Sequence, residues 1–172
     1  KKLRETSNLN EVNGYTNHKI QSELRFYKSK LMDVTTILRL PFVFSADDYS
    51  NRFQGLCELS LAGIDSVIES ACKYSLVRRD DAAEAIMRVL HSNCIGIADL
   101  SNTGCITSKE LVNTVNRSAP LIKESGSLEL GDFPYFVERD ICLNSQKITI
   151  DLPIVEAISI EAKNYWLARN FA

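Results

Sequence analysis

The sequence predicts a mainly helical α+β protein, in which a helical bundle precedes a smaller mixed part with one β-hairpin and a closing helix. Apolar residues recur at spacings of three and four through most of residues 17–94, as on the buried face of a helix. Two short runs within 135–152 partly alternate apolar and polar residues, as strands do. A helical pattern returns after Pro153, a residue suited to a first helical turn.

Three parts are expected along the 172 residues. Residues 1–16 are polar and Asn-rich, which is typical of a linker or a poorly ordered lead-in. Residues 17–94 form the helical part and residues 95–172 the mixed part. Because the chain begins at Lys1 without Met or a signal-peptide pattern, we expect a fragment of a larger intracellular, cytoplasmic protein.

Composition narrows the class of protein. The net charge is -2 and the pI about 5.8, which gives no overall reason to expect nucleic-acid or membrane-surface binding. No run of about eighteen apolar residues occurs, so no membrane insertion is expected. The five cysteines are odd in number and irregularly spaced, with no C-x-x-C pair. Neither a disulfide framework nor a zinc site is therefore expected.

An apolar seam predicts one long helix from about Thr16 to the residue before Pro41. Its members follow one another at spacings of 4, 3, 4, 3 and 4, and we call them the 20–38 seam: Ile20, Leu24, Tyr27, Leu31, Val34 and Leu38. An uncovered seam would bind another protein or a second copy of this chain. The alternative is that the seam packs within its own chain, as most such stripes do.

Three more helices are expected before the mixed part is complete. The first runs from a cap at Ser45 to about Leu76. The second covers 80–94, with the acids Asp80 and Asp81 at its positive start, and the third covers 108–117.

One segment carries a pattern with a chemistry of its own. Asp99 to Glu110 reads D-x-S-x-T-G-x-I-T-x-x-E, which resembles the twelve-residue calcium loop of an EF-hand. The resemblance implies a ligand set of Asp99, Ser101, Thr103, Cys105 and Glu110. Only two of these side chains are anionic, and no second loop occurs, so the predicted site is weak. The competing interpretation is a capping box, in which Thr107 and Glu110 start a helix.

The same region also resembles part of a winged-helix domain. Helices 80–94 and 108–117 would be its first two helices, and residues 135–152 its two-stranded wing. The recognition helix would fall within 118–131, where Pro120 and two glycines make a poor helix. This pattern favours a winged-helix-like module for protein contact over one that reads DNA.

No catalytic pattern accompanies these elements. The chain has no P-loop and no G-x-G-x-x-G, and neither His18 nor His91 lies in a hydrolase or metalloprotease motif. The predicted function is therefore a non-enzymatic protein–protein interaction or regulatory module without a cofactor, whose partner is another protein or a second copy. The alternatives are a calcium-responsive switch at 99–110 and a winged-helix nucleic-acid-binding domain.

Overall fold

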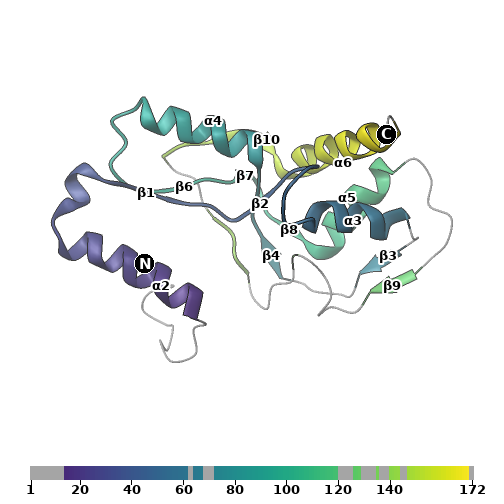
Figure 1. Ribbon diagram of the computed structural model, residues 1–172, viewed down its shortest axis with the longest axis horizontal. Helices are drawn as coiled ribbons and strands as arrows, with labels where there is room; N and C mark the ends of the chain where they lie inside the picture. The colour runs from purple at the N-terminus through teal and green to yellow at the C-terminus, as the bar shows by residue number, and fades with distance from the viewer. Residues whose placement is uncertain are drawn as a thin grey trace. The chain divides into compact units, whose positions relative to one another are not determined.

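A computed structural model describes residues 14–61, 64–67, 72–119, 126–128, 135, 140–143 and 147–170 (Figure 1). The helices are α2 (Gly14–Lys28), the 3-10 helix η1 (Leu31–Val34), α3 (Arg52–Leu61), α4 (Arg79–Leu90), α5 (Ser108–Ser118) and α6 (Ile154–Asn170). The strands are β1 (Thr36–Arg39), β2 (Phe42–Phe44), β3 (Ile64–Val67), β4 (Lys73–Tyr74), β5 (Leu76–Arg78), β6 (Gly96–Asp99), β7 (Asn102–Thr103), β8 (Ile106–Thr107), β9 (Gly126–Leu128) and β10 (Ile150–Pro153). None of the helices within these ranges is both long and apolar enough to cross a membrane.

Most strand pairs are parallel and join distant parts of the sequence. β2 pairs with β5, β3 with β9 and β7 with β10, all in parallel, and β1 lies beside β6. Within the described ranges, only β4 and β8 pair antiparallel. A tight hairpin cannot connect parallel strands, and here α3 lies between β2 and β5 along the chain, and α5 between β7 and β10. The architecture is therefore α/β, and the predicted helical bundle is wrong.

The contacts divide the chain into two units, the first holding Lys1–Ile37 and Cys94–Ile97 and the second Leu38–Asn93 and Ala98–Ala172. In the first unit, Lys30 adopts a left-handed conformation with φ 58°, between the end of α2 and the start of η1. The Thr36 hydroxyl donates to the Cys94 carbonyl, and the Gly96 N–H donates to the Thr35 carbonyl over 2.9 Å. These bonds join the two segments of this unit.

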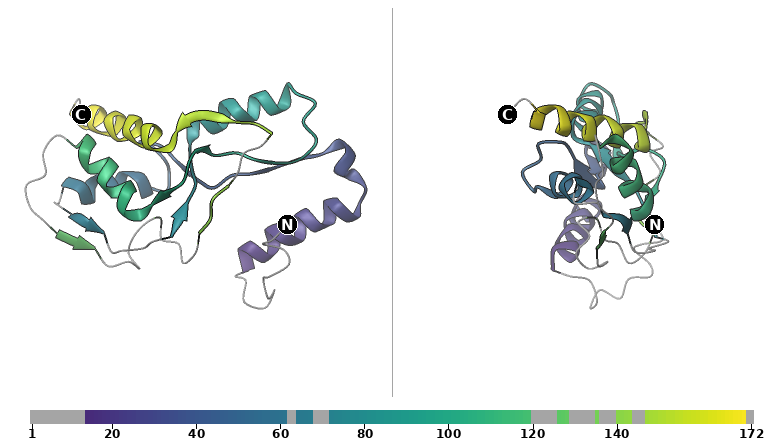
Figure 2. Two further views of the ribbon diagram at one scale, coloured as in Figure 1. Left: turned by 180° about the vertical axis from the view of Figure 1, so that it is seen from behind. Right: turned by 90° about the vertical axis from the view of Figure 1, so that its right-hand side faces the viewer.

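The core of the second unit forms where α3, α5 and α6 pack against one another (Figure 1, Figure 2). Leu111 and Val115 lie one turn apart on α5, and Ile158 and Ala162 one turn apart on α6, and all four are fully buried. This spacing places each pair on one helix face, so that the two faces can bury one another. A smaller cluster covers β5 and α4: Val77, Ala82, Ala85, Leu100 and Ile150.

The predicted helix over the 20–38 seam is wrong beyond Lys28. The seam residues lie in three elements, with Ile20, Leu24 and Tyr27 in α2, Leu31 and Val34 in η1, and Leu38 in β1. The chain leaves the helical conformation at Lys30, and the run from Val34 to Ile37 is rich in β-branched residues. Such residues lose side-chain freedom in helices and pack well in strands.

Two further predictions are also wrong, while the later helices are confirmed. The helix expected from a cap at Ser45 to Leu76 begins only at Arg52 and ends at Leu61, and β3 follows at Ile64. The hairpin expected within 135–152 does not form between its two described parts, because β10 pairs with β7, and Ile141 bridges to Tyr74. The helices expected at 80–94, at 108–117 and after Pro153 are present as α4, α5 and α6.

Candidate functional site

Two parallel strands of the second unit end side by side. β2 and β5 are in register, with Phe44 opposite Arg78 at their carboxyl ends. In open α/β sheets, ligands bind outside the carboxyl ends of the parallel strands. A ligand site is therefore expected beside the segments that follow these two strands, residues 45–48 and 79–81.

Arg78 is the central charge at this edge. Its guanidinium donates to Asp81 Oδ1, with Nε at 3.0 Å, and another guanidinium nitrogen lies 3.6 Å from Glu161 Oε1. The Asp81 and Glu161 side chains are only 9% and 5% exposed, so these carboxylates depend on protein partners rather than water. The hydrogen bond to Asp81 raises the pKa of Arg78. Burial alone would raise the pKa of Asp81, but hydrogen bonds from Arg78 and Asn102 and the Arg78 charge hold it below its usual value.

Asn102 ties this ion pair to two neighbouring strands. It is 0% exposed, and its Nδ2 donates to Asp81 Oδ2 over 2.8 Å and to the Leu152 carbonyl over 3.2 Å. Its Oδ1 accepts the Arg78 backbone N–H over 2.8 Å. One amide side chain therefore connects β5, β7, β10 and the first turn of α4.

Glu161 fixes the segment after β2 to α6. Its Oε2 accepts the Ala46 N–H over 2.7 Å, while its other oxygen faces Arg78. Beyond it, Arg79 pairs with Asp47 over 2.6 Å at an exposed position, where an ion pair contributes little. The charged side chains at this edge pair with one another rather than with a ligand. Their role is therefore to position the loop after β2.

A cavity of about 190 Å³ lies nearby, lined by residues 101–104, Leu143 and 149–150. The lining consists of hydroxyl, amide, aliphatic and backbone groups, with no charged side chain among these residues. The Thr103 hydroxyl donates to the Ile150 carbonyl over 2.6 Å along one wall. Such a lining suits a small neutral polar ligand or water.

The proposed calcium ligands lie in different surroundings. Asp99 ends β6, Ser101 is buried beside β7, and Thr103 bonds the Ile150 carbonyl. Cys105 forms a disulfide, and Glu110 is the second member of a capping box. Within the described ranges, no group of three or more His, Cys, Asp or Glu side chains could hold a metal ion.

The competing capping-box interpretation of this segment is confirmed. The Thr107 N–H donates to Glu110 Oε2 over 2.8 Å, and the Glu110 N–H donates to Thr107 Oγ1 over 3.2 Å. Hydrogen bonds from the Thr107 backbone and hydroxyl hold the pKa of Glu110 below its usual value. The Gly104 turn has φ 98° and leads into this helix start.

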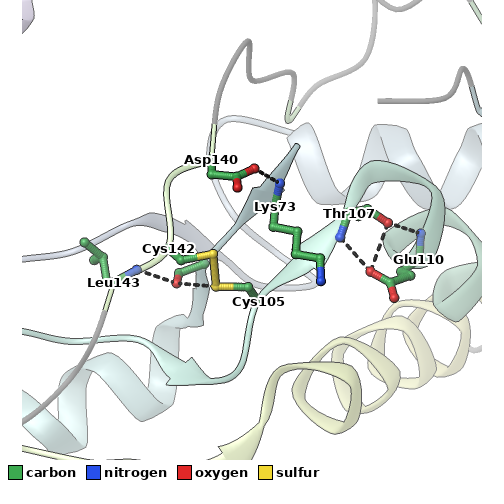
Figure 3. The surroundings of a disulfide bond; sticks show 8 residues. Lys73, Cys105, Thr107, Glu110, Asp140, Cys142 and Leu143 are labelled. Atoms are coloured by element: carbon green, nitrogen blue, oxygen red, sulfur yellow. Dashed lines mark hydrogen bonds between the residues drawn. A yellow bond between two sulfur atoms is a disulfide. The ribbon is translucent and has the colours of Figure 1, made fainter. Parts of the chain in front are cut away.

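A disulfide joins Cys105 to Cys142, with their Cα atoms 6.0 Å apart (Figure 3). The irregular cysteine spacing did not predict it, since a sequence does not show which cysteines meet in space. The other three cysteines, Cys57, Cys72 and Cys94, form no disulfide.

The first unit holds a pair of side chains, Tyr15 and Lys19, that can take part in proton transfer. Tyr15 is 72% exposed in the first turn of α2, and the Lys19 ammonium lies 5.4 Å from the centroid of its ring. An exposed phenol with a cation one turn away can exchange a proton with a bound molecule. Sequence reasoning missed this pair, whose only signal is a Tyr and a Lys four residues apart at a helix start.

The chain matches solved structures of sugar-nucleotide enzymes. A dTDP-glucose 4,6-dehydratase from Bacillus anthracis in complex with NAD is 11% identical, with a TM-score of 0.66 over 90% of this chain and 51% of its own. A UDP-glucose 4-epimerase from Thermotoga maritima with UDP-glucose is 15% identical, with a TM-score of 0.65 over 88% and 52%. A UDP-glucose 4-epimerase from Bifidobacterium longum with NAD+ and UDP is 12% identical, with a TM-score of 0.61 over 91% and 55%. No protein-family model and no curated protein sequence matches the chain.

These likenesses show the fold and correct the earlier predictions. The neighbours are α/β enzymes of the Rossmann type, which contradicts the mainly helical, winged-helix-like fold class. They equally contradict the predicted non-enzymatic regulatory module, the calcium-responsive switch and the winged-helix nucleic-acid-binding domain. The chain spans about half the length of these structures. Partner binding through the 20–38 seam and the part boundaries at 16 and 94 stay predictions.

Proposed function

We propose that this chain is part of an enzyme that acts on a nucleotide-linked sugar. The observation that carries this proposal is the likeness, over about 90% of the chain, to a dTDP-glucose dehydratase and two UDP-glucose epimerases. A dTDP-4-dehydrorhamnose reductase that binds NADP adds a third reaction on the same fold, with a TM-score of 0.60. A sugar bound to a nucleotide is the chemical feature that the names of these proteins share.

Tyr15 is the residue we assign to proton transfer. Reducing a sugar carbonyl places a proton on its oxygen, and oxidising a sugar hydroxyl removes one, so such an enzyme needs a group that gives and takes a proton. The exposed Tyr15 hydroxyl is such a group. Lys19, beside its ring, supplies a positive charge that stabilises negative charge developing on a neighbouring oxygen.

Gly14, Gly55 and Gly104 do not form the phosphate-binding part of a dinucleotide site. The chain contains no G-x-G-x-x-G. A glycine that lets a phosphate approach closely leaves no room for a Cβ, whereas a Cβ at Gly14 or Gly55 would meet nothing within 4 Å. At Gly104 it would meet only Ile154, at an ordinary 3.6 Å. Residues other than these three glycines would have to hold the phosphates of NAD or NADP, and the role of Tyr15 does not depend on which residues they are.

The test uses the complete protein that contains this chain. Purified protein is assayed with UDP-glucose, UDP-N-acetylglucosamine and dTDP-glucose, each with NAD and NADP, and products are identified by mass spectrometry. Tyr15→Phe removes one exposed hydroxyl and should lower kcat by about a hundredfold or more without changing thermal stability. Tyr27→Phe makes the same change on the same helix and is the matched control.

The two parts of the proposal fail separately. If no nucleotide sugar is turned over or bound, the substrate class is wrong. If a nucleotide sugar is turned over and Tyr15→Phe retains the full rate, the function stands and the role of Tyr15 is wrong.

A further inference from the structure

The disulfide joins two segments that are distant in sequence (Figure 3). It links the turn between β7 and β8 to the segment 140–143, across a sequence separation of 37. Cys142 is exposed and Cys105 half-buried. A small thiol can therefore reach the bond from solvent, which a fully buried structural disulfide would prevent.

Each cysteine is next in the chain to a residue that lines the cavity described above. Gly104 precedes Cys105 in the chain, Leu143 follows Cys142, and both Gly104 and Leu143 line that cavity. The bond therefore ties together two parts of the cavity wall that are distant in sequence. Breaking it removes the covalent restraint on their separation.

The 140–143 segment also has noncovalent attachments that survive reduction. The Ile141 N–H donates to the Lys73 carbonyl over 2.8 Å, and the Ser75 N–H donates to the Ile141 carbonyl over 3.0 Å. The Asp140 carboxylate accepts the Lys73 N–H over 2.8 Å. These bonds hold the segment against β4, so the two thiols stay near one another and the disulfide can form again.

Ser75 connects this attachment to the cysteines themselves. Its hydroxyl accepts the Leu143 N–H over 2.9 Å and lies 3.6 Å from Cys105 Sγ. A change at the Cys105 sulfur therefore acts on the group that bonds the cavity-lining residue Leu143.

The remaining cysteines do not form a disulfide framework. Cys57, Cys72 and Cys94 form no disulfide, and burial raises the pKa of Cys57 to about 12, which keeps it unreactive. A single disulfide, in a chain whose other cysteines form none, fits reversible chemistry better than the dense frameworks of small secreted domains do.

We propose that Cys105 and Cys142 form a reversible thiol–disulfide site that controls the wall of the adjoining cavity. A thiolate such as glutathione attacks the Cys142 sulfur and releases Cys105 as a thiolate. A second glutathione thiolate attacks the glutathione sulfur of the mixed disulfide and releases Cys142, giving oxidised glutathione. Two electrons pass from two glutathione molecules to the protein disulfide, and the two cysteine thiolates take up protons from water. Oxidised glutathione reverses each step.

The first measurement follows the two sulfurs in the folded protein. The protein is equilibrated with millimolar oxidised or reduced glutathione, free thiols are alkylated, and peptide mass spectrometry locates them. Cys105 and Cys142 should be linked in the first case, alkylated in the second, and linked again after return to oxidised glutathione. The proposal is overturned if both stay alkylatable in oxidised glutathione, or if the folded protein keeps the bond in reduced glutathione.

The second measurement follows the cavity wall. Hydrogen exchange should be roughly tenfold faster at the Leu143 amide in the reduced protein, because local opening becomes easier. Cys105→Ser should show the faster exchange under both conditions, whereas Cys94→Ser, at a cysteine outside the disulfide, should respond as the wild type does. Equal exchange at Leu143 in oxidised and reduced wild-type protein would show that the bond does not control the wall, whatever the variants do.

Discussion

Replacing Asn102 with Asp exchanges a buried N–H donor group for an oxygen while leaving the shape of the side chain unchanged. Asn102 is 0% exposed, and its Nδ2 donates to Asp81 Oδ2 at 2.8 Å and to the Leu152 carbonyl at 3.2 Å. In the variant, a carboxylate oxygen faces these two acceptors. The substitution therefore replaces two hydrogen bonds by two repulsive contacts.

The expected loss in unfolding free energy follows from the buried groups that are left without hydrogen-bond partners. Each buried polar group that loses its hydrogen bond costs about 1–3 kcal/mol. The Asp81 carboxylate and the Leu152 carbonyl both lose a donor, so the expected loss in unfolding free energy is about 3–5 kcal/mol at neutral pH. Since native domains are stable by only about 5–15 kcal/mol, this is a large fraction of the total.

The loss in unfolding free energy caused by Asn102→Asp should be smaller in acid than at neutral pH. In the wild type, burial opposes but does not outweigh the hydrogen bonds from Arg78 and Asn102, and the pKa of Asp81 is lowered. Asp81 therefore stabilises the wild type above its unfolded pKa, and this contribution is lost as the pH falls through its folded pKa. In Asn102→Asp, protonating one of the two facing carboxyls restores a donor. The difference between variant and wild type should therefore shrink as the pH falls from neutral to acid.

Urea unfolding measured by tryptophan fluorescence tests both expectations. Trp166 is the only tryptophan and is 6% exposed in the core, so it reports unfolding of the second unit. Asn93→Asp makes the same chemical change at an exposed position and should leave stability within about 0.5 kcal/mol of the wild type. A loss below about 1 kcal/mol at neutral pH, or an equal loss at every pH, would refute the role given to Asn102.

Three further predictions use the same unfolding measurement. Thr107→Ala removes the helix cap and should cost about 1 kcal/mol. Because the pKa of Glu110 is lowered, its ionised carboxylate stabilises the protein above the unfolded pKa, and this contribution is lost as the pH falls through the folded pKa. The loss of stability caused by Thr107→Ala should therefore shrink in acid, and an equal loss at every pH would contradict the capping role. Reducing the Cys105–Cys142 disulfide opens a loop of sequence separation 37 and should cost up to about 4 kcal/mol in the wild type and nothing in Cys105→Ser. Leu111→Ala should cost about 2–5 kcal/mol, and a cost under 1 kcal/mol would place Leu111 outside the core.

The parts of the fold that local signals determine were predictable. Asp80 and Asp81 lie in the first turn of α4, and Thr107 and Glu110 cap α5, as the sequence indicated. Pro153 precedes α6, also as indicated. These starts depend on residues within one turn, so local sequence could place them, whereas the cap expected at Ser45 is wrong because α3 begins only at Arg52.

Strand pairing was not predictable in the same way. Ile150 of β10 pairs with Asn102 of β7, and the sequence of neither short segment indicates which strand it pairs with. The 20–38 seam continued through Leu38 because apolar spacing over a few residues fits a helix and a buried strand alike. The Tyr15–Lys19 pair was missed because two residues at a spacing of four recur often by chance. The Cys105–Cys142 bond depends on the same long-range pairing as the strands.

The position of α6 and β10 in the chain affects how the protein can be made. Ala46 donates its N–H to Glu161, and Asn102 donates to Leu152, so early segments depend on partners synthesised much later. Contacts between residues so far apart slow folding, because a long loop must close before they form. During synthesis, the core around α3 and α5 therefore stays incomplete, with apolar surface exposed, until α6 leaves the ribosome. A nascent chain of this protein is accordingly expected to need chaperone protection until α6 has been synthesised.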